Sequence, residues 1–238
     1  MVDIKSELIQ KAKAVGIKIK PEQAQQFQRY MELLLEWNEK INLTAIVEPS
    51  EIVEKHFIDS IMLLSECDIK NGARVIDVGT GAGFPGIPLK IMRADIDLTL
   101  LDSTNKKLTF LNTVCNDLGI KVGTVHKRAE EAGLDKKMRE SYDVAVSRAV
   151  APMNILAEYC IPFIKMKGTF IAMKGPSLSE EMKTAEGAIS RLGGECREVL
   201  SLSLPCGDER NIAVVAKTRF TPPEFPRHGS TISKHPLS

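Results

Sequence analysis

The sequence predicts a doubly wound α/β fold: a mostly parallel sheet with helices on both faces, an antiparallel C-terminal hairpin and an N-terminal helical extension. Three observations lead to this prediction. The first 65 residues show helical periodicity, short β-rich runs alternate with helical ones from Arg74 onward, and two late strand-like runs have no helix between them. Alternating strands and helices are typical of parallel sheets covered on both faces. We expect an N-terminal helical extension over residues 1–68, an α/β domain over 69–220 and a tail over 221–238.

Length and composition limit the possible functions. The chain has 238 residues, of which 43% are hydrophobic, enough for one sizeable core with a small attachment. Its 32 basic and 31 acidic residues give a net charge of +1, so a polyanion would have to bind at a local patch. The N-terminus is charged from its third residue, and no uncharged apolar run approaches the roughly 20 residues of a membrane span. We expect a soluble, cytoplasmic monomer without a membrane partner.

The N-terminal segment is predicted to be helical. Pro21 suits the first turn of a helix. The apolar residues after it recur at helical spacing and form one stripe: Phe27, Tyr30, Met31, Leu34 and Ile41. A second helix is expected over residues 50–65, with these side chains facing inward: Ile52, Phe57, Ile61 and Leu64.

The central segment supplies the strands of the parallel sheet. Five β-rich runs are separated by helical stretches: RVIDV (74–78), DLTLLD (97–102), KVGTVH (121–126), YDVAVS (142–147) and GTFIAMKG (168–175). Two more runs, CREVLSLSLP (196–205) and ERNIAVVAK (209–217), have only a short turn between them and should pair as an antiparallel hairpin at a sheet edge. The last 18 residues are basic and rich in proline, which predicts a flexible tail.

The run VIDVGTGAGFPGIPLK (75–90) leads from a strand through a glycine-rich turn into a helix that should begin near residues 84–87. Gly79, Gly81 and Gly83 let the backbone turn sharply and approach a ligand that side chains would exclude. The free N–H groups of the following helix favour a negative or electron-rich group. This turn is therefore predicted to bind a nucleotide-like ligand.

Two fingerprints fit the same turn. Gly81, Gly83 and Gly86 match the GxGxxG pattern of dinucleotide-binding enzymes. Asp77, with Gly79 and the next two glycines of the turn, matches the DxGxGxG pattern of S-adenosylmethionine methyltransferases. Either match alone is weak, so the surrounding residues have to decide between the two cofactors.

Acidic residues at two strand ends bear on that decision. Asp102 ends the second strand, where a carboxylate would accept hydrogen bonds from the ribose hydroxyls of either cofactor. Asp77 is expected to point toward the methionine amino group, for which a dinucleotide enzyme has no equivalent, although it would also suit capping of local backbone N–H groups. The antiparallel last strand is characteristic of the Rossmann-like methyltransferase fold. Methyl transfer is therefore favoured, with an NAD-dependent oxidoreductase as the alternative.

The ends of the third and fourth strands indicate the substrate. Ala129 and Glu130 follow the third strand, where this architecture commonly contacts adenine, with a plain exposed helix start as the alternative. The fourth strand ends in SRAVAP (147–152), which lacks the Asn or Asp, the two prolines and the aromatic residue typical of enzymes that methylate exocyclic amino groups of bases. A target nitrogen without a proton, such as N7 of guanine, is therefore favoured.

Seven motifs occur in an order that resembles the RsmG (GidB) family of bacterial methyltransferases. They are WNEKINLT (37–44), HFIDS (56–60), VIDVGTGAGFPGIPLK (75–90), LLDSTNKKLTFL (100–111), SRAV (147–150), MKG (173–175) and ERNIAVV (209–215). The resemblance extends from about residue 20 to the tail. It implies S-adenosyl-L-methionine as cofactor and methylation of N7 of guanine-527 in 16S ribosomal RNA. It also implies that the small ribosomal subunit, rather than free guanosine, is the substrate.

The resemblance further implies site residues. The cofactor contacts it implies are Gly79, Phe84, Asp102, Ser103, Thr104, Ala129, Glu130 and Arg148. Because guanine N7 carries no proton, no general base is required and catalysis should come mainly from positioning in a pocket that excludes water. Arg148 is expected to shape the junction between cofactor and guanine, or to be a structural arginine bound to backbone carbonyls. Lys174 is a candidate to hold a phosphate or the guanine O6, or an ordinary strand-end lysine. A non-catalytic RNA-binding or ribosome assembly factor remains an alternative.

RNA contacts are expected from local basic patches, with a solvated charged face as the alternative. The candidates are Lys121, Lys127, Arg128, Lys136, Lys137 and Arg139, and then Lys217, Arg219, Arg227 and Lys234 near the tail. His56, Asp59 and Ser60 share one helix face and are interpreted as a polar clasp between the helical segment and the sheet. The five cysteines are scattered, with no CxxC pair and no histidine at metal-ligand spacing, so no metal is expected.

Overall fold

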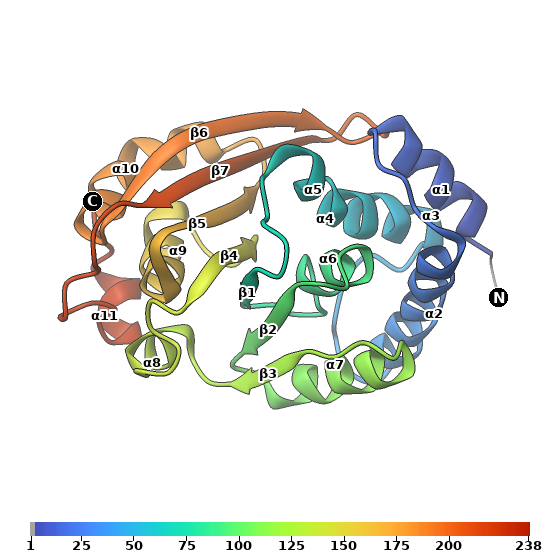
Figure 1. The fold of residues 1–238 in the computed structure, drawn as a ribbon, viewed down its shortest axis with the longest axis horizontal. Helices are drawn as coiled ribbons and strands as arrows, with labels where there is room; N and C mark the ends of the chain where they lie inside the picture. Colours follow the sequence, from blue (N-terminus) through green and yellow to red (C-terminus); the bar gives the residue numbers. More distant parts are fainter. Residues whose placement is uncertain (1–2) are drawn as a thin grey trace.

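The computed structural model describes residues 3–238. Its centre is a seven-stranded sheet with the order β3-β2-β1-β4-β5-β7-β6 (Figure 1). The strands are β1 (Arg74–Val78), β2 (Asp97–Asp102), β3 (Gly123–His126), β4 (Tyr142–Arg148), β5 (Ile164–Lys174), β6 (Gly194–Ser203) and β7 (Glu209–Lys217). Strands β1 to β5 are parallel, whereas β7 is antiparallel to both β5 and β6. The predicted doubly wound sheet with its C-terminal hairpin is confirmed.

The sheet is buried on both faces. Val75 and Leu100 belong to one hydrophobic cluster, whereas Ile76, Val78 and Leu101 belong to another. Successive side chains of a strand point to opposite faces, so these two clusters lie on the two sides of the sheet. This pattern explains why the parallel strands read as almost continuous apolar runs.

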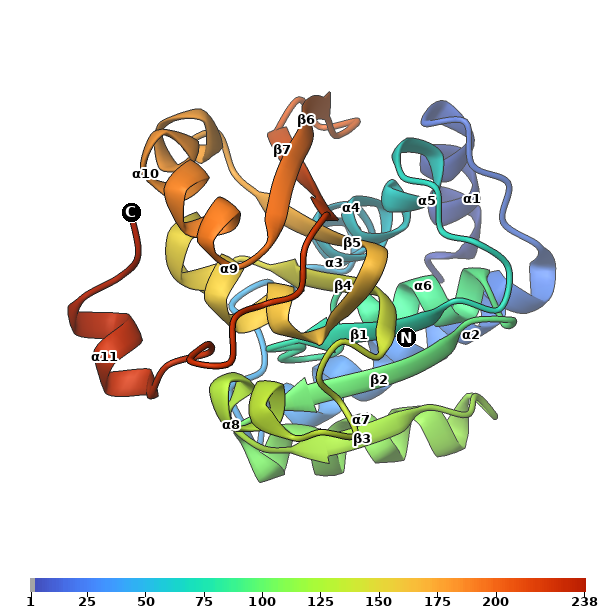
Figure 2. The same ribbon diagram turned by 60° about the vertical axis from the view of Figure 1, so that its left-hand side comes forward.

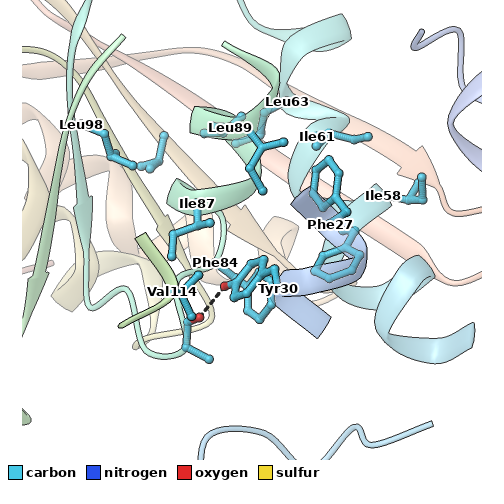
Figure 3. Packing of buried hydrophobic residues seen from close by; sticks show 14 of the residues in the cluster. Phe27, Tyr30, Ile58, Ile61, Leu63, Phe84, Ile87, Leu89, Leu98 and Val114 are labelled. Carbon is cyan, nitrogen blue, oxygen red and sulfur yellow. Dashed lines mark hydrogen bonds between the residues drawn. The ribbon is translucent and has the colours of Figure 1, made fainter. Parts of the chain in front are cut away.

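The first face of the sheet is covered by the N-terminal helices together with two helices of the α/β part. They are α1 (Lys5–Ala14), α2 (Pro21–Asn38), α3 (Pro49–Ile52), α4 (Asp59–Ile61), α5 (Leu63–Glu66), α6 (Gly86–Met92) and α7 (Asn105–Asp117). Figure 3 shows Phe27 and Tyr30 of α2 packed against Phe84, Ile58 and Ile61. The predicted stripe on α2 is confirmed except for Ile41, which lies beyond the helix end at Asn38 and is only half-buried.

The segment predicted as one helix over residues 50–65 is helical but not uniform. A π-helical segment, Val53–Ile58, lies between α3 and α4. Ile52, Phe57 and Ile61 are fully buried as predicted, and Leu64 is half-buried. π-Helical turns are rare and frequent at functional sites. This one carries His56, whose surroundings are described below.

The second face is covered by helices from the C-terminal half. They are α8 (Ala129–Leu134), α9 (Met153–Cys160), a 3₁₀ turn (Ile161–Phe163), α10 (Leu178–Arg191) and α11 (Gly229–Lys234). Phe163 and Phe170 are fully buried between these helices and the sheet.

The tail over residues 221–238 differs from the prediction of a flexible segment. Phe225 and Leu237 are buried in the cluster on the second face, and α11 lies between them in the chain (Figure 2). Arg227 forms an ion pair of 2.7 Å with Glu158, whose side chain is fully buried. Proline-rich composition suggested that too little apolar surface could be buried. Phe225, Leu237 and the ion pair with the buried Glu158 nevertheless hold the tail on the protein. The prediction of a flexible tail is therefore corrected.

Within residues 3–238, no helix combines the length and the apolar character that crossing a bilayer requires.

Candidate active site

A cavity of about 370 Å³ opens at the carboxyl ends of β1, β2 and β4, beside the segment that follows β3. This volume lies within the roughly 300–1,000 Å³ of small-molecule sites. The strand order reverses between β1 and β4, and ligands of open α/β sheets bind at such a switch point. The lining residues are Val78, Gly79, Leu101, Asp102, Ser103, Thr104, Lys107, Lys127, Arg128, Ala129, Glu130, Arg148, Ala149, Val150 and Tyr159.

The glycine turn after β1 forms one wall of the cavity. Gly79 and Gly81 adopt φ angles of 71° and 60°, which side chains other than glycine rarely tolerate. The backbone N–H groups of Gly79 and Thr80 donate to the carbonyl of Leu101 at 2.9 and 3.1 Å, so the turn is tied to the end of β2. The backbone at Gly79 is therefore bare and fixed beside Asp102.

Asp102 is the carboxylate at the end of β2. Its Oδ2 accepts a hydrogen bond from the N–H of Gly81 at 3.0 Å, and its Oδ1 accepts one from the N–H of Thr104 at 2.8 Å. A carboxylate has about four acceptor positions. Each oxygen therefore keeps capacity for a further donor, such as one of two neighbouring hydroxyl groups. The predicted position of Asp102, Ser103 and Thr104 in the cavity wall agrees with the structure.

The end of β3 supplies the opposite wall. A hydrogen bond of 3.1 Å links His126 Nε2 to the carbonyl of Ser103 and holds the β2 and β3 ends together. Ala129 and Glu130 begin α8 directly after this point, and both line the cavity as predicted.

Arg148 ends β4 and lines the cavity while its guanidinium is held from behind. Nη1 donates to Asp59 Oδ2 at 2.8 Å and to the carbonyl of Lys55 at 3.1 Å, and Nη2 lies 3.2 Å from His56 Nδ1. The guanidinium also lies 4.9 Å from the centre of the Phe84 ring. Arg148 thus combines the two expected features, a place in the cavity wall and a bond to a backbone carbonyl.

The clasp predicted for the HFIDS motif is present. Asp59 pairs with Arg148 of β4 and with Arg210 of β7, at 2.8 and 3.2 Å. His56 stacks on Phe84 with ring centres 4.4 Å apart, and its Nε2 lies 2.8 Å from Thr44 Oγ1. Burial, and next the charge of Arg148, lower the pKa of His56 to about 3, so the ring is neutral near pH 7.

Ser60 takes no part in this clasp. Its hydroxyl donates to the carbonyl of His56, one helical turn earlier, at 2.6 Å. The clasp predicted on the shared helix face therefore consists of His56 and Asp59 without Ser60.

The loop from β4 to α9 lies directly over the glycine turn. Ala149 has a φ of 52°, and Val150 is exposed. A Cβ atom built on Gly79 would be 2.8 Å from Val150 Cγ2, so any side chain at position 79 would collide with this loop. The requirement for glycine at position 79 thus comes from the loop as well as from the turn.

Asp77 does not face the cavity, in contrast to the prediction. It is fully buried, and its Oδ2 accepts hydrogen bonds from Thr80 Oγ1 at 2.7 Å and from the N–H of Gly86 at 2.8 Å. Burial raises the pKa of Asp77 to about 6, although these hydrogen bonds oppose the rise. The capping alternative fits the structure: Asp77 ties the glycine turn to the start of α6.

Three more predicted cofactor contacts lie behind the cavity wall. A Cβ on Gly83 would be 2.6 Å from Tyr30 Oη, so this glycine is needed for packing against α2. Phe84 is buried between Tyr30 and His56. Gly81 acts through Asp102, to which it donates its N–H. None of these three residues is part of the cavity lining, and Tyr30 of α2 occupies the space beside Gly83.

Lys174 also lies elsewhere than predicted. Its Nζ donates to the carbonyl of Ala151 at 2.7 Å and pairs with Glu181 at 2.8 Å. The side chain is 9% exposed and is absent from the cavity lining. Its charge is compensated within the protein, and its position suits the support of the β4 to α9 loop.

Several lining residues were not singled out by the sequence as cavity residues: Lys107, Ala149, Val150 and Tyr159. The first three stand inside motifs that the sequence highlighted, so their proximity to the site was detectable. Tyr159 is on α9, and only the packing of that helix on the sheet brings it to the cavity.

Metal binding has no candidate site in the part of the chain that the structure describes, since no group of three or more His, Cys, Asp or Glu side chains is suitably placed there.

Comparison with protein families gives one match over most of the chain. Residues 23–212 match the family described as rRNA small subunit methyltransferase G. The chain is 48% identical over 234 residues to the ribosomal RNA small subunit methyltransferase G of Clostridium perfringens strain 13, covering 97% of this chain and 98% of that one. The protein of the same name from Desulforamulus reducens is 46% identical over the full length of both chains.

Solved structures agree on the fold. TrmN from Thermus thermophilus superposes with a TM-score of 0.53 and 15% identity, over 67% of this chain and 48% of that one. Precorrin-6y C5,15-methyltransferase from Geobacter metallireducens gives a TM-score of 0.51 and 12% identity, over 76% of this chain and 96% of that one. At these identities the likeness concerns the fold alone.

Proposed function

We propose, from the premise that the chain belongs to the rRNA small subunit methyltransferase G family, that it methylates N7 of guanine-527 in 16S ribosomal RNA with S-adenosylmethionine as the methyl donor. The substrate we propose is the RNA within the small ribosomal subunit, and the compartment is the cytoplasm. The observation that carries the proposal is the placement of Asp102, at the end of β2 and beside the bare backbone of Gly79, in one cavity.

S-adenosylmethionine fits the residues of this cavity. Both oxygens of Asp102 keep acceptor capacity, which suits the two ribose hydroxyls. Ala129 and Glu130, which line the cavity, are the residues we assign to the adenine, and the Gly79 backbone, which also lines it, is assigned to the methionine end. When bound, this cofactor supplies a methyl group carried on a positively charged sulfur.

The residues of the chain do not need to move a proton. Guanine N7 has a free lone pair, and the cavity lining contains no histidine. The nearby His56 is neutral and covered by Phe84. The contribution of the protein is therefore orientation and exclusion of water, and orientation alone supplies on the order of 7–11 kcal/mol in well-aligned reactions.

We assign positioning roles to the two residues expected to be catalytic. Arg148, fixed by Asp59 and Lys55, forms a rigid wall where the cofactor and the guanine would meet. Lys174 holds the β4 to α9 loop through the carbonyl of Ala151. In this proposal neither side chain abstracts a proton.

We further propose that the RNA approaches over a cationic rim formed by Lys106, Lys107 and Arg128. Lys107 and Arg128 line the cavity, and Lys106 and Lys107 line a shallow neighbouring hollow that shares Thr104 with it. Within residues 3–238, none of the three has an acidic partner at ion-pair distance. A cofactor that carries positive charge does not need these cations, whereas a phosphate backbone does.

Four of the other basic residues considered from the sequence are occupied by internal contacts. Arg139 donates to the carbonyls of Gly133, Thr221, Pro222 and Phe225. Lys127 forms an ion pair with Asp135, and Arg227 forms one with Glu158. Lys217 is buried in the core. In the tail, Arg227 is therefore committed to an internal ion pair, whereas Lys234 is exposed.

The proposal is tested with small subunits from cells that lack this methyltransferase. The protein is incubated with these particles and labelled S-adenosylmethionine, and N7-methylguanine is mapped by chemical cleavage of the 16S RNA. We expect one labelled site, at guanine-527. Label at another nucleotide would refute the proposed target. Cofactor binding without label would favour a non-catalytic assembly factor, and thermal stabilisation by NAD but not by S-adenosylmethionine would favour an oxidoreductase.

The Asp102→Ala variant tests the observation that carries the proposal. It removes a charged acceptor, and each hydrogen bond to a charged group contributes about 1.5–3 kcal/mol. We expect the affinity for S-adenosylmethionine, measured by calorimetry, to fall at least about tenfold. Thr109→Ala, which changes an exposed residue of α7 away from the cavity, is the control and should bind as the wild type does.

A further inference from the structure

The C-terminal tail, residues 221–238, is anchored at several points on the second face of the molecule. Arg227 donates through Nε and Nη2 to the carboxylate of Glu158, and its backbone N–H donates to the same group at 2.8 Å. Asn154 Nδ2 donates to the carbonyl of Leu237 at 2.9 Å. Glu158 and Asn154 both belong to α9, so the tail is fastened to the helix that also carries the cavity residue Tyr159.

The tail touches the cavity wall first at Glu130. A Cβ atom on Gly229 would be 2.1 Å from Glu130 Oε1 and 3.0 Å from Glu130 Cδ. The carboxylate of Glu130 therefore lies against the backbone of Gly229, in space that any larger residue at position 229 would fill. One turn further along α8, Gly133 packs on Pro226, with 3.0 Å between its added Cβ and Pro226 Cγ.

The second contact is at Tyr159. Its side chain lines the cavity, and Ser233 of α11 lies near it, with the Ser233 hydroxyl donating to the carbonyl of Gly229 at 2.9 Å. Burial raises the pKa of the Tyr159 phenol, and the nearby Ser233 hydroxyl acts against the rise. Two side chains of the cavity are thus held from outside by one short helix.

We propose that the tail is the outer brace of the cofactor cavity, with Gly229 and Ser233 as positioning residues that fix Glu130 and Tyr159. This inference rests on the proposed function, because the ligand of the cavity is taken to be S-adenosylmethionine. Neither Gly229 nor Ser233 lines the cavity, so both act through the side chains they contact.

The brace acts by packing rather than by charge. The guanidinium of Arg227 is committed to Glu158 and to the carbonyl of His235, which leaves it no role toward a ligand. With Gly229 in place, the Glu130 carboxylate is kept in one location beside Ala129, where the adenine would lie. A larger residue at 229 displaces only the end of a flexible side chain, so the cavity changes while the fold does not.

The test compares Gly229→Ala and Ser233→Ala with two controls, in the full-length protein. Gly175→Ala is the first control, since an added Cβ there has no neighbour within 4 Å. Thr231→Ala, on the same helix as Ser233, is the second. We expect Gly229→Ala to weaken binding of S-adenosylmethionine on the order of 10- to 100-fold, the range for the loss of one hydrogen bond to a charged group. The controls should bind like the wild type, and the melting temperatures of all the ligand-free proteins should agree.

A double-mutant cycle separates positioning from general damage. In a Glu130→Ala background, Gly229→Ala should have no further effect on affinity, because the displaced side chain is gone. Wild-type affinity in Gly229→Ala, or an undiminished loss in the Glu130→Ala background, would overturn the brace. If the wild-type protein itself failed to bind S-adenosylmethionine, the proposed function would fall, and the brace with it.

Discussion

Two carboxylates hold the glycine turn from different sides. Asp102 accepts from Gly81 at the cavity, whereas Asp77 accepts from Thr80 and Gly86 in the core. The first lines the cavity, whereas the second is fully buried away from it with Oδ1 unpartnered among the described residues. We therefore assign ligand binding to Asp102 and loop geometry to Asp77, because only Asp102 borders the cavity.

Asp77→Asn should change how stability depends on pH. The pKa of Asp77 is raised from 3.8 to about 6, so between these values the folded protein binds more protons than the unfolded chain. Stability is therefore lost as the pH rises through this window, by up to about 3 kcal/mol at pH 7. Asparagine keeps one oxygen for both hydrogen bonds and has no charge to bury. We expect the unfolding free energy of the variant, relative to wild type, to increase between about pH 4 and pH 7 in urea titrations.

Asp117→Asn provides a control of opposite sign. A hydrogen bond with Arg29, the largest cause, lowers the pKa of this exposed carboxylate. Its removal should therefore cost more at pH 7 than at pH 4, the reverse of the Asp77 variant. A pH-independent difference for Asp77→Asn would show that folding does not raise the pKa of this carboxyl group. A large loss of S-adenosylmethionine affinity in Asp77→Asn would instead restore the predicted contact with the methionine end.

At the scale of single elements, α2 and the start of α7 shape the site from outside the sheet. Tyr30 of α2, labelled in Figure 3, lies next to Phe84. Its hydroxyl donates to the carbonyl of Ala82 within the glycine turn and lies against Gly83. The start of α7 directs Lys106 and Lys107 to the hollow beside the cavity. Helix α2 therefore fixes the wall of the cavity, and α7 carries the two lysines that we propose contact the RNA.

The cationic rim predicts a specific salt dependence. Replacing Lys106 and Lys107 together by alanine should weaken small-subunit binding and reduce the slope of log affinity against log salt by about one for each phosphate that is no longer neutralised. The matched control replaces Lys13 and Lys18, two exposed lysines of the N-terminal segment without an acidic partner in residues 3–238. An unchanged salt slope in the Lys106 and Lys107 variant, or an equal change in the control, would place the RNA on another face.

Local sequence patterns predicted the strands and the cavity residues better than they predicted the residues that hold the cavity wall in place. Each β-rich run is recognisable from its own residues, and Asp102 is defined by its position at a strand end. The orientation of Asp77 depends on Gly86, nine residues away, and on burial beneath α6. The docking of the tail depends on Glu158, 69 residues before Arg227. Such long-range partners leave no periodic signal, so composition alone suggested a mobile tail.

At the scale of the whole molecule, the N-terminal helices are built into the core of the sheet. Ile4 and Leu8 of the N-terminal segment are fully buried in the same cluster as Val75 and Leu98 of the strands. The cluster on the other face contains Leu178 of α10 and is separated from the first only by the sheet itself. Loss of either cluster exposes one face of the same strands, so the two faces should unfold together.

Leu8→Ala and Leu178→Ala test whether the N-terminal helical extension folds as part of this unit. Both side chains are fully buried, and a Leu→Ala substitution in a core typically costs about 2–5 kcal/mol. For a chain of this size each kcal/mol lowers the melting temperature by about 2–4 °C. We expect each variant to lower one common calorimetric transition by at least about 4 °C, with S-adenosylmethionine raising it in both. Leu8→Ala could instead shift a separate transition and leave the ligand-stabilised transition unchanged. Residues 1–68 would then be an independent domain. In that case the support that α2 gives the glycine turn would not be part of the cofactor site.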